Sequence, residues 1–122
     1  MAKQPMYTIE TYGSVIWFQV LKDRLLDTDD IAELGQALMR QTDLVPKISL
    51  VLEMQAVTHM SSAMLGKLVA LHKKVTKVRG RMCICGLGPS LMPLFKVTKL
   101  HKVFDLQPSA QDMILMYKRK PL

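Results

Sequence analysis

The chain has 122 residues, of which 49% are apolar and 22% charged, and its formal net charge at neutral pH is +7. This length and composition predict one globular domain over residues 1–122 with a buried core, and they exclude a disordered chain. No apolar run approaches the roughly 20 residues that a membrane-spanning helix needs, and the start of the chain lacks the apolar core of a signal peptide. We therefore expect a cytoplasmic protein without a membrane partner.

The first two elements are predicted to form a β-hairpin. Residues 7–12 and 15–20 are strand-like runs, and Gly13-Ser14 separates them. A two-residue loop that begins with glycine is typical of a type II′ turn between antiparallel strands. The second run is apolar on both faces, so we expect it to lie inside the sheet.

A helix follows, and its start is predicted at Asp27 or Thr28. Either side chain can cap the helix, and the carboxylates that come next suit the positive end of the helix dipole. Apolar residues then repeat at helical spacing to about Gln41. We expect the helix to end before Pro46, because the residue that precedes a proline avoids helical backbone angles.

The stretch from residue 48 to residue 68 is the centre of the chain's organisation. The apolar run Ile48–Met54 predicts a buried strand, and a short connection over residues 55–60 leads to Ser61-Ser62. A helical pattern then runs to about Val78. A serine at such a junction caps the helix, and the same position also holds a phosphate well, because the free N–H groups and the helix dipole both favour negative charge.

This helix is predicted to have one large apolar face and one small, basic face. Gly66 falls on the outer face, and a glycine inside a helix costs roughly 1 kcal/mol relative to alanine. It is therefore either a tolerated glycine or a place where a partner approaches closely. We expect Leu50, Leu52, Leu65, Leu68 and Val75 to be buried and Lys67, Lys74 and Lys77 to be exposed. The full apolar arc comprises Met64, Leu65, Leu68, Val69, Leu71, Val75 and Val78, and the outer arc comprises Ala63, Gly66, Lys67, Ala70, Lys73, Lys74 and Lys77.

The helix is predicted to end at Arg79-Gly80, where Gly80 is available for the left-handed cap. Residues 81–85 then predict a fourth strand. Cys83 and Cys85 are one residue apart, so in a strand both thiols face the same side and cannot easily form a disulfide bond. Because no cluster of histidines or cysteines lies nearby, we interpret them as reduced strand residues rather than metal ligands.

Two short elements are expected in the next segment. Residues 86–89 form a turn without the spacing of a phosphate-binding loop, and Pro89 fits the first position of a helix. The helix over residues 91–98 is expected to be interrupted or curved near Pro93, and residues 103–106 can add a short edge strand.

The last helix is predicted to start at Ser109, which together with Asp112 resembles a capping box, and to run through Tyr117. Three cations follow, and they suit the negative end of the helix dipole. The order of elements is thus β-β-α-β-α-β-α-β-α. This order predicts an α/β fold with a mixed sheet of four to five strands and helices packed mainly on one face.

The sequence shows none of the residue combinations that are typical of a catalytic site. No nucleophile is paired with a base, and neither a metal-binding cluster nor a nucleotide fingerprint is present. His72 lies on the apolar side of its helix with no acid or hydroxyl group beside it in sequence, which is typical of a histidine at the edge of a core. We therefore predict a protein that is not an enzyme and has no catalytic residues, metal site or cofactor.

The sequence resembles a known family. Residues 50–58, 61–66, 79–81, 85–87 and 95–105 are similar, in order and spacing, to the STAS domain. That domain is shared by bacterial anti-sigma factor antagonists and by the cytoplasmic tails of sulfate transporters. The resemblance covers nearly the whole chain and implies the α/β fold described above.

The resemblance also implies a phosphorylation site. The family's central motif places Asp, then Ser and Ser or Thr, then Gly, Leu and Gly after the third strand, and in antagonists a partner that is both anti-sigma factor and kinase phosphorylates the first hydroxyl residue. Aligned without gaps, the phosphoacceptor falls on Ser62, while Ser61 takes the position of the Asp and is the second candidate. The other aligned positions are Ala63 for the second hydroxyl, Met64 for the first glycine, Leu65 and Gly66 as matches, Glu53 for the strand acid and Asp27 for the acid after the second strand.

The resemblance implies a non-enzymatic module for protein interaction, and most simply an anti-sigma factor antagonist controlled by serine phosphorylation. Its partner would be an anti-sigma factor that is also a serine kinase, or a related regulatory protein. Whether the chain forms a homodimer through its N-terminal hairpin is left open by the sequence. The residues expected to bind the partner are Asp27, Ser61, Ser62, Ala63, Gly66, Lys67 and Ala70.

An alternative function rests on the distribution of charge. Residues 1–60 contain five Lys and Arg against eight Asp and Glu, a balance of −3, whereas residues 61–122 contain twelve against two, a balance of +10. A basic half can bind nucleic acid or another acidic ligand. Lysine outnumbers arginine, however, and aromatic residues do not interleave with the basic ones except at Tyr117, so we do not expect nucleic acid as the partner.

Overall fold

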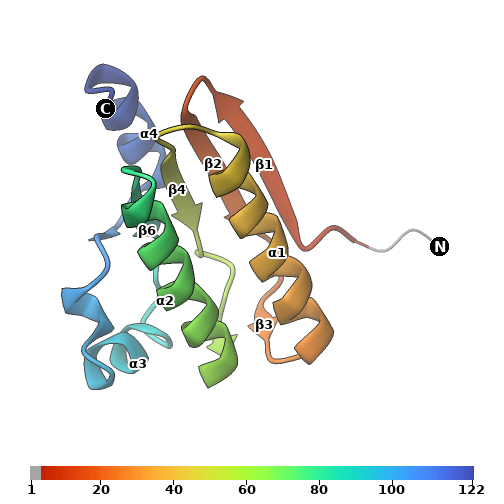
Figure 1. The fold of residues 1–122 in the computed structure, drawn as a ribbon. Coiled ribbons are helices and arrows are strands. Elements are labelled where there is room, and N and C mark those ends of the chain that lie inside the picture. The colour runs from red at the N-terminus through yellow and green to blue at the C-terminus, as the bar shows by residue number, and fades with distance from the viewer. Residues whose placement is uncertain (1–3) are drawn as a thin grey trace.

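The computed structural model describes residues 4–122, and its centre is a five-stranded mixed sheet (Figure 1). The strand order is β1-β2-β4-β6-β7; β1 pairs with β2 in antiparallel fashion, and the other three pairings are parallel. The predicted α/β fold with a mixed sheet is confirmed. The strands are β1 (Tyr7–Tyr12), β2 (Val15–Val20), β4 (Ser49–Glu53), β6 (Arg81–Cys85) and β7 (Leu106–Gln107).

Helices cover both faces of the sheet, and the two longest lie side by side on one of them (Figure 1). On that face Phe18, Leu52 and Leu68 are completely buried in the main core. On the other face Val51 and Cys83 pack against Met113 and the rest of the last helix in a second, smaller core. The helices are α1 (Thr28–Leu44), α2 (Ser62–Lys77), α3 (Met92–Val97) and α4 (Ala110–Arg119), with a 3₁₀ turn, η1, at Leu100–Lys102.

The N-terminal hairpin is confirmed, with Tyr12 paired to Val15 across its turn. Gly13 has a φ of +64°, as the first central position of a type II′ turn requires. β2 lies inside the sheet, between β1 and β4, as its apolar character on both faces predicted.

Several predicted boundaries are shifted. α1 continues three residues beyond Gln41 to Leu44, and in its last turn the buried Thr42 hydroxyl donates to the carbonyl of Leu38. α3 begins at Met92, so Pro89 lies in the preceding turn and Pro93 stands in the first turn of the helix instead.

A short edge strand was expected over residues 103–106. The structure has this strand as β7, which is only two residues long and ends one residue later than predicted. The side chain of Phe104 is buried in the core immediately before it. The expected capping of α4 is confirmed, because the Ser109 hydroxyl accepts a hydrogen bond from the Asp112 N–H at 3.2 Å.

The end of α2 differs from the prediction in an informative way. Arg79, and not Gly80, adopts the left-handed conformation, with a φ of +61°. Gly80 is needed for space, because a Cβ atom there would lie 2.6 Å from the carbonyl oxygen of Ile48. That oxygen accepts a hydrogen bond from the Arg81 N–H at 2.8 Å, which joins β4 to β6, so it cannot retreat without breaking the sheet.

We therefore expect Gly80→Ala to lower the free energy of unfolding by about 1–3 kcal/mol, as overpacking at a well-packed site does. Gly88→Ala is the matched control, because a Cβ atom at Gly88 would meet no atom within 4 Å. Chemical denaturation of both variants measures the difference. Equal stability of the two would show that the contact between Gly80 and Ile48 is not tight.

Candidate functional site

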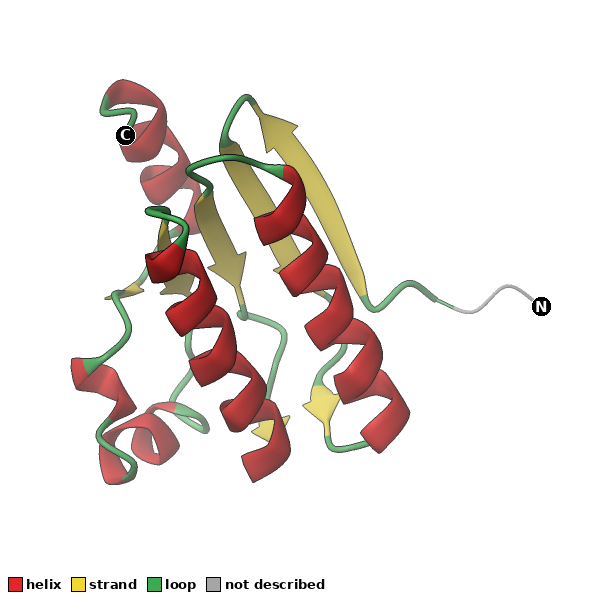
Figure 2. Cartoon of the chain, viewed as in Figure 1, coloured by secondary structure: helices red, strands yellow, loops and turns green. Residues whose placement is uncertain are grey.

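The candidate site lies where α1 and α2 begin, at one end of the molecule. Two short strands, β3 (Arg24–Leu25) and β5 (His59–Met60), pair in parallel beside these helix starts (Figure 2). Leu25 is in register with Met60, and both side chains are buried. Because each strand leads into its helix within a few residues, the pair places the first turn of α1 next to the first turn of α2.

Three backbone contacts hold this junction together. The carbonyl oxygen of Asp23 accepts hydrogen bonds from the N–H groups of Thr58 and His59, at 2.7 and 3.2 Å, and the Ser61 N–H donates to the carbonyl of Leu25 at 3.1 Å. The Thr58 hydroxyl also lies 3.2 Å from the Asp23 carbonyl. Neither β3 nor β5 was predicted from the sequence, because a two-residue strand is too short to show the alternation by which strands are recognised.

Ser61 is the N-cap of α2. Its backbone is extended, and its Oγ accepts a hydrogen bond from the Met64 N–H at 3.3 Å. The residue is half-buried between the β5 strand and the helix. Its hydroxyl is thus committed to one of the free N–H groups of the first turn.

We expect Ser61→Ala to lower the free energy of unfolding by about 1 kcal/mol, because the Met64 N–H then loses its acceptor. Ser61→Asp should restore most of that loss, since an aspartate caps as well as a serine. Thermal unfolding of the three proteins measures the effect. An alanine variant as stable as the wild type would contradict the capping role.

Ser62 differs from its neighbour, although the two are adjacent in sequence. It is the first residue of α2 and is exposed to solvent. Within residues 4–122 its side chain takes part in none of the hydrogen bonds that the structure shows. The structure therefore separates a capping hydroxyl from an accessible one at the positive end of the helix.

The outer face of α2 near its start is exposed, and it is made of small residues. Ala63, Gly66 and Ala70 are all exposed, and a Cβ atom at Gly66 would meet no other atom within 4 Å. Packing within this chain therefore does not require glycine at position 66. The backbone of α2 is accessible at this point to another molecule.

Lys67 connects the two helices. Its side-chain carbons pack against α1 at Gly35, where a Cβ atom would lie 3.1 Å from the Lys67 Cδ. The residue remains exposed, as expected, so its ammonium group stands at the surface beside the seam between the helices. This contact gives Gly35, which the sequence analysis did not single out, a role in helix packing.

Asp27 caps α1 and is exposed. Its Oδ1 accepts hydrogen bonds from the N–H groups of Asp29 and Asp30, at 2.9 and 3.1 Å. Asp30 also forms an ion pair with Lys22. α1 therefore begins at an exposed carboxylate cap.

The burial predicted for β4 and α2 is largely confirmed. All five residues that were expected in the core are buried, and Lys67 and Lys77 are exposed. Lys74 is only half-exposed because it forms an ion pair with Asp43 of α1. Val78 was placed on the apolar face but is 38% exposed, because the helix ends at Lys77 and the chain turns away there.

The other candidate residues lie away from the starts of α1 and α2. Glu53 accepts a hydrogen bond from Gln19 Nε2 at 2.6 Å and lines a shallow cavity of about 290 Å³ at the start of α4. His72 is half-buried and packs edge-on against Phe104, with 5.4 Å between the ring centroids, as a histidine at the edge of the core does.

The two cysteines lie under α4. Cys83 and Cys85 are free and buried, with 3.6 Å between their sulfur atoms. The hydrogen bond with Cys83 and burial raise the pKa of the Cys85 thiol. That thiol is therefore protonated, and unreactive, at neutral pH.

Among residues 4–122, no group of three or more His, Cys, Asp or Glu residues is arranged to hold a metal ion. None of the helices in this range is long and apolar enough to cross a membrane.

Comparison with known proteins agrees with the fold. A family model described as the STAS domain matches residues 8–113. The structure is similar to that of an anti-sigma factor antagonist from Mycobacterium paratuberculosis, with 26% sequence identity, 92% of each chain covered and a TM-score of 0.75.

Two further solved structures share the fold at lower identity. One is an anti-sigma factor antagonist (STAS) domain protein from Planctomyces limnophilus, with 13% identity, 92% of this chain and 97% of that chain covered, and a TM-score of 0.78. The other is the Bacillus cell fate determinant SpoIIAA in its phosphorylated form, with 13% identity, 88% and 96% covered, and a TM-score of 0.69. Because the family model spans most of the chain, this protein belongs to the STAS domain family.

Proposed function

We propose that this STAS domain is an anti-sigma factor antagonist that binds its partner through the start of α2 and releases it when Ser62 is phosphorylated. The similarity to the antagonist from Mycobacterium paratuberculosis over 92% of both chains supports the class of function. A similar structure that is described in a phosphorylated form supports the mode of control. The partner is then an anti-sigma factor that is also a serine kinase.

The observation that carries the proposal is the difference between the two serines. A kinase needs an accessible hydroxyl, and Ser62 is exposed and free of hydrogen bonds in the described part of the chain, whereas Ser61 is half-buried and bound to the Met64 N–H. Phosphorylating Ser62 leaves the cap in place. The N–H groups and the dipole at the start of α2 also favour the added negative charge, so the fold tolerates it.

The docking surface extends from Ser62 along the small outer face of α2. Ala63, Gly66 and Ala70 leave the helix backbone accessible, so that a partner can approach more closely than it could over larger side chains. Lys67 and Asp27 border this surface on the side of α1. An interface packed this closely excludes water from the Ser62 side chain.

Phosphate acts on the interface through its charge. It adds about −1.5 to −2 charges at Ser62, which is exposed at the start of α2. Within a closely packed interface this charge must lose its water shell, which costs more than the open helix end gains from it. Partner binding is therefore weakened while the fold is retained.

The chain contributes binding surface to this cycle and no catalysis. The phosphoryl group is transferred by the partner, and the exposed serine only has to accept it. In this proposal residues 1–122 act as one STAS domain in the cytoplasm.

The test is to locate phosphate on the protein as isolated from its native host, by intact-mass measurement and peptide mapping. The proposal expects one phosphate on Ser62 in the wild type, none in Ser62→Ala, and an unchanged amount in Ser61→Ala. Phosphate on Ser61 alone would show that the capping serine is the acceptor. If neither serine carries phosphate under any growth condition, the chain is a constitutive binding module and the proposed control is wrong.

A further inference from the structure

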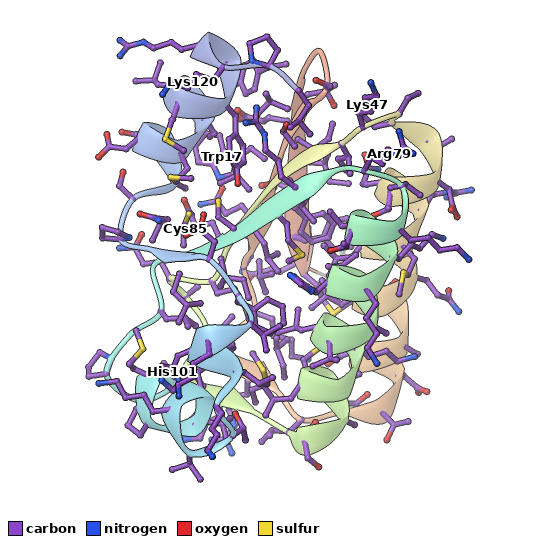
Figure 3. All side chains as sticks on the ribbon, turned by 60° about the vertical axis from the view of Figure 1, so that its left-hand side comes forward. Trp17, Lys47, Arg79, Cys85, His101 and Lys120 are labelled. Carbon is purple, nitrogen blue, oxygen red and sulfur yellow. The ribbon has the colours of Figure 1, made fainter. Side chains whose placement is uncertain are left out.

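A group of cations lies at the end of the molecule opposite Ser61 and Ser62. Here α1, α2 and α4 end while β4 and β6 begin, and Figure 3 shows Lys47, Arg79 and Lys120 at this end. We call this group the basic end, and all of its members are exposed. It consists of Lys47, Lys77, Arg79, Lys118, Arg119 and Lys120.

The fold brings these residues together from three separate segments. Ser49 on β4 and Arg81 on β6 are in register. Lys47 lies two residues before Ser49, and Arg79 lies two residues before Arg81. The two cations therefore lie side by side. The Arg81 guanidinium stacks 4.2 Å from the centre of the Tyr117 ring and donates to the carbonyls of Tyr117 and Lys120. The cations at the end of α4 are thereby fixed beside the start of β6.

Within residues 4–122, no ion pair includes a member of the basic end. The ion pairs in this range are Lys22 with Asp30 and Lys74 with Asp43. Cations in the last turn of a helix are explained by the helix dipole, but Lys47 and Arg79 lie outside the helices. Both adopt left-handed backbone conformations, with φ of +48° and +61°, which glycine or asparagine adopts more readily. Local backbone preference therefore does not explain these two cations.

Exposed apolar side chains stand among the cations. Leu44, at the end of α1, is 66% exposed, and Val78, immediately before Arg79, is 38% exposed. Basic residues mixed with exposed apolar ones on one end of a protein are the combination that binds the interface of an anionic lipid bilayer.

We propose that the basic end docks on an anionic membrane surface, with its cations at the lipid headgroups and Leu44 and Val78 in the interfacial layer. The sequence alone predicted no membrane partner because it lacks a spanning segment, and a surface contact does not need one. The 16 residues of α2 separate the two ends by about 24 Å. Docking in this way places Ser62 at the end of the molecule that points away from the bilayer, where it is free to bind a protein.

The same observations disfavour nucleic acid at this site. Four of the six cations are lysines, which lack the planar guanidinium fork that makes arginine the preferred residue for recognising nucleic acid. Tyr12, an exposed aromatic residue near this end, lies beneath the Lys118 ammonium at 3.9 Å and donates a hydrogen bond to Glu10. Its ring is therefore not free to stack on a base.

The test is co-sedimentation of the full chain with vesicles of phosphatidylcholine, either pure or with about one third phosphatidylserine, at low and at physiological salt. The wild type should bind only the anionic vesicles, and more weakly at the higher salt. Lys47→Glu with Arg79→Glu should weaken this binding by roughly tenfold or more, since each cation near the surface contributes several-fold. Leu44→Ser should reduce the binding that persists at the higher salt.

The matched control is Lys96→Glu with Lys99→Glu, on and after α3. It changes the net charge by the same amount, and Lys99 also has a left-handed backbone, with φ of +61°. Circular dichroism verifies that both double variants are folded. The proposal is overturned if the two double variants lose binding equally, if anionic vesicles bind no better than neutral ones, or if a random-sequence DNA duplex binds more tightly than the vesicles, which would make nucleic acid the ligand.

Discussion

Replacing Leu68 by alanine should lower the free energy of unfolding by about 2–5 kcal/mol. Leu68 is completely buried where α2 packs on the sheet, among Phe18, Leu50 and Leu52. The substitution removes the transfer energy of the lost methyl groups and leaves a cavity, because the neighbouring strands cannot collapse into it. Urea denaturation with an unchanged m-value measures the loss.

Gly66→Ala is the control on the opposite face of the same helix. An added methyl group there meets no atom within 4 Å, so the substitution should raise stability by up to about 1 kcal/mol through helix propensity alone. The pair of variants thus tests the orientation of α2. A Leu68→Ala protein as stable as the wild type would mean that the helix presents a different face to the sheet.

Replacing Ser62 by aspartate should weaken partner binding by about a hundredfold, which corresponds to about 3 kcal/mol, because the carboxylate loses its water shell in the interface. The fold should gain a few tenths of a kcal/mol to about 1 kcal/mol from the charge at the helix start. Affinity capture from a lysate of the native host identifies the protein that wild type retains and Ser62→Asp does not. Titration calorimetry with that protein, and thermal unfolding, then separate the two effects.

Ser14→Asp is the matched control, because it adds the same charge at a serine in the turn between β1 and β2, where aspartate is a common residue. It should leave the affinity for the partner unchanged. A loss of affinity as large as that of Ser62→Asp would indicate a general charge effect. A Ser62→Asp variant that binds as well as wild type would place the docking surface elsewhere.

The fold could be predicted from the sequence where long periodic segments decide the structure. The apolar run before Ser61 and the helical repeat after it predict β4 and α2, and the caps at Asp27, Ser61 and Ser109 mark helix starts that the structure confirms. These features are local, so the sequence shows them without any knowledge of distant contacts.

Features that depend on contacts between distant segments could not be predicted. The left-handed cap was predicted at Gly80 and is found at Arg79. The close approach of Ile48 to Gly80 is visible only once β4 and β6 are paired. The β3 and β5 strands are each two residues long, and only their mutual pairing identifies them. For the same reason the cations of the basic end cannot be grouped from the sequence.

The candidate site was found from the sequence as a pair of serines, and the sequence did not distinguish them by environment. The distinction between a capping hydroxyl and a free one depends on the hydrogen bond from the Met64 N–H to Ser61, which fixes one rotamer of one side chain. Which residues a partner contacts stays a prediction.

The measurement that tests the central claim most directly is the Kd of the captured partner for the wild-type chain in two forms, one fully phosphorylated at Ser62 and one treated with phosphatase. Peptide mapping verifies the position of the phosphate before each titration. The proposal predicts that phosphorylation raises the Kd by about a hundredfold or more, and that phosphatase restores the original value. Equal Kd values for the two forms would contradict a switch at Ser62.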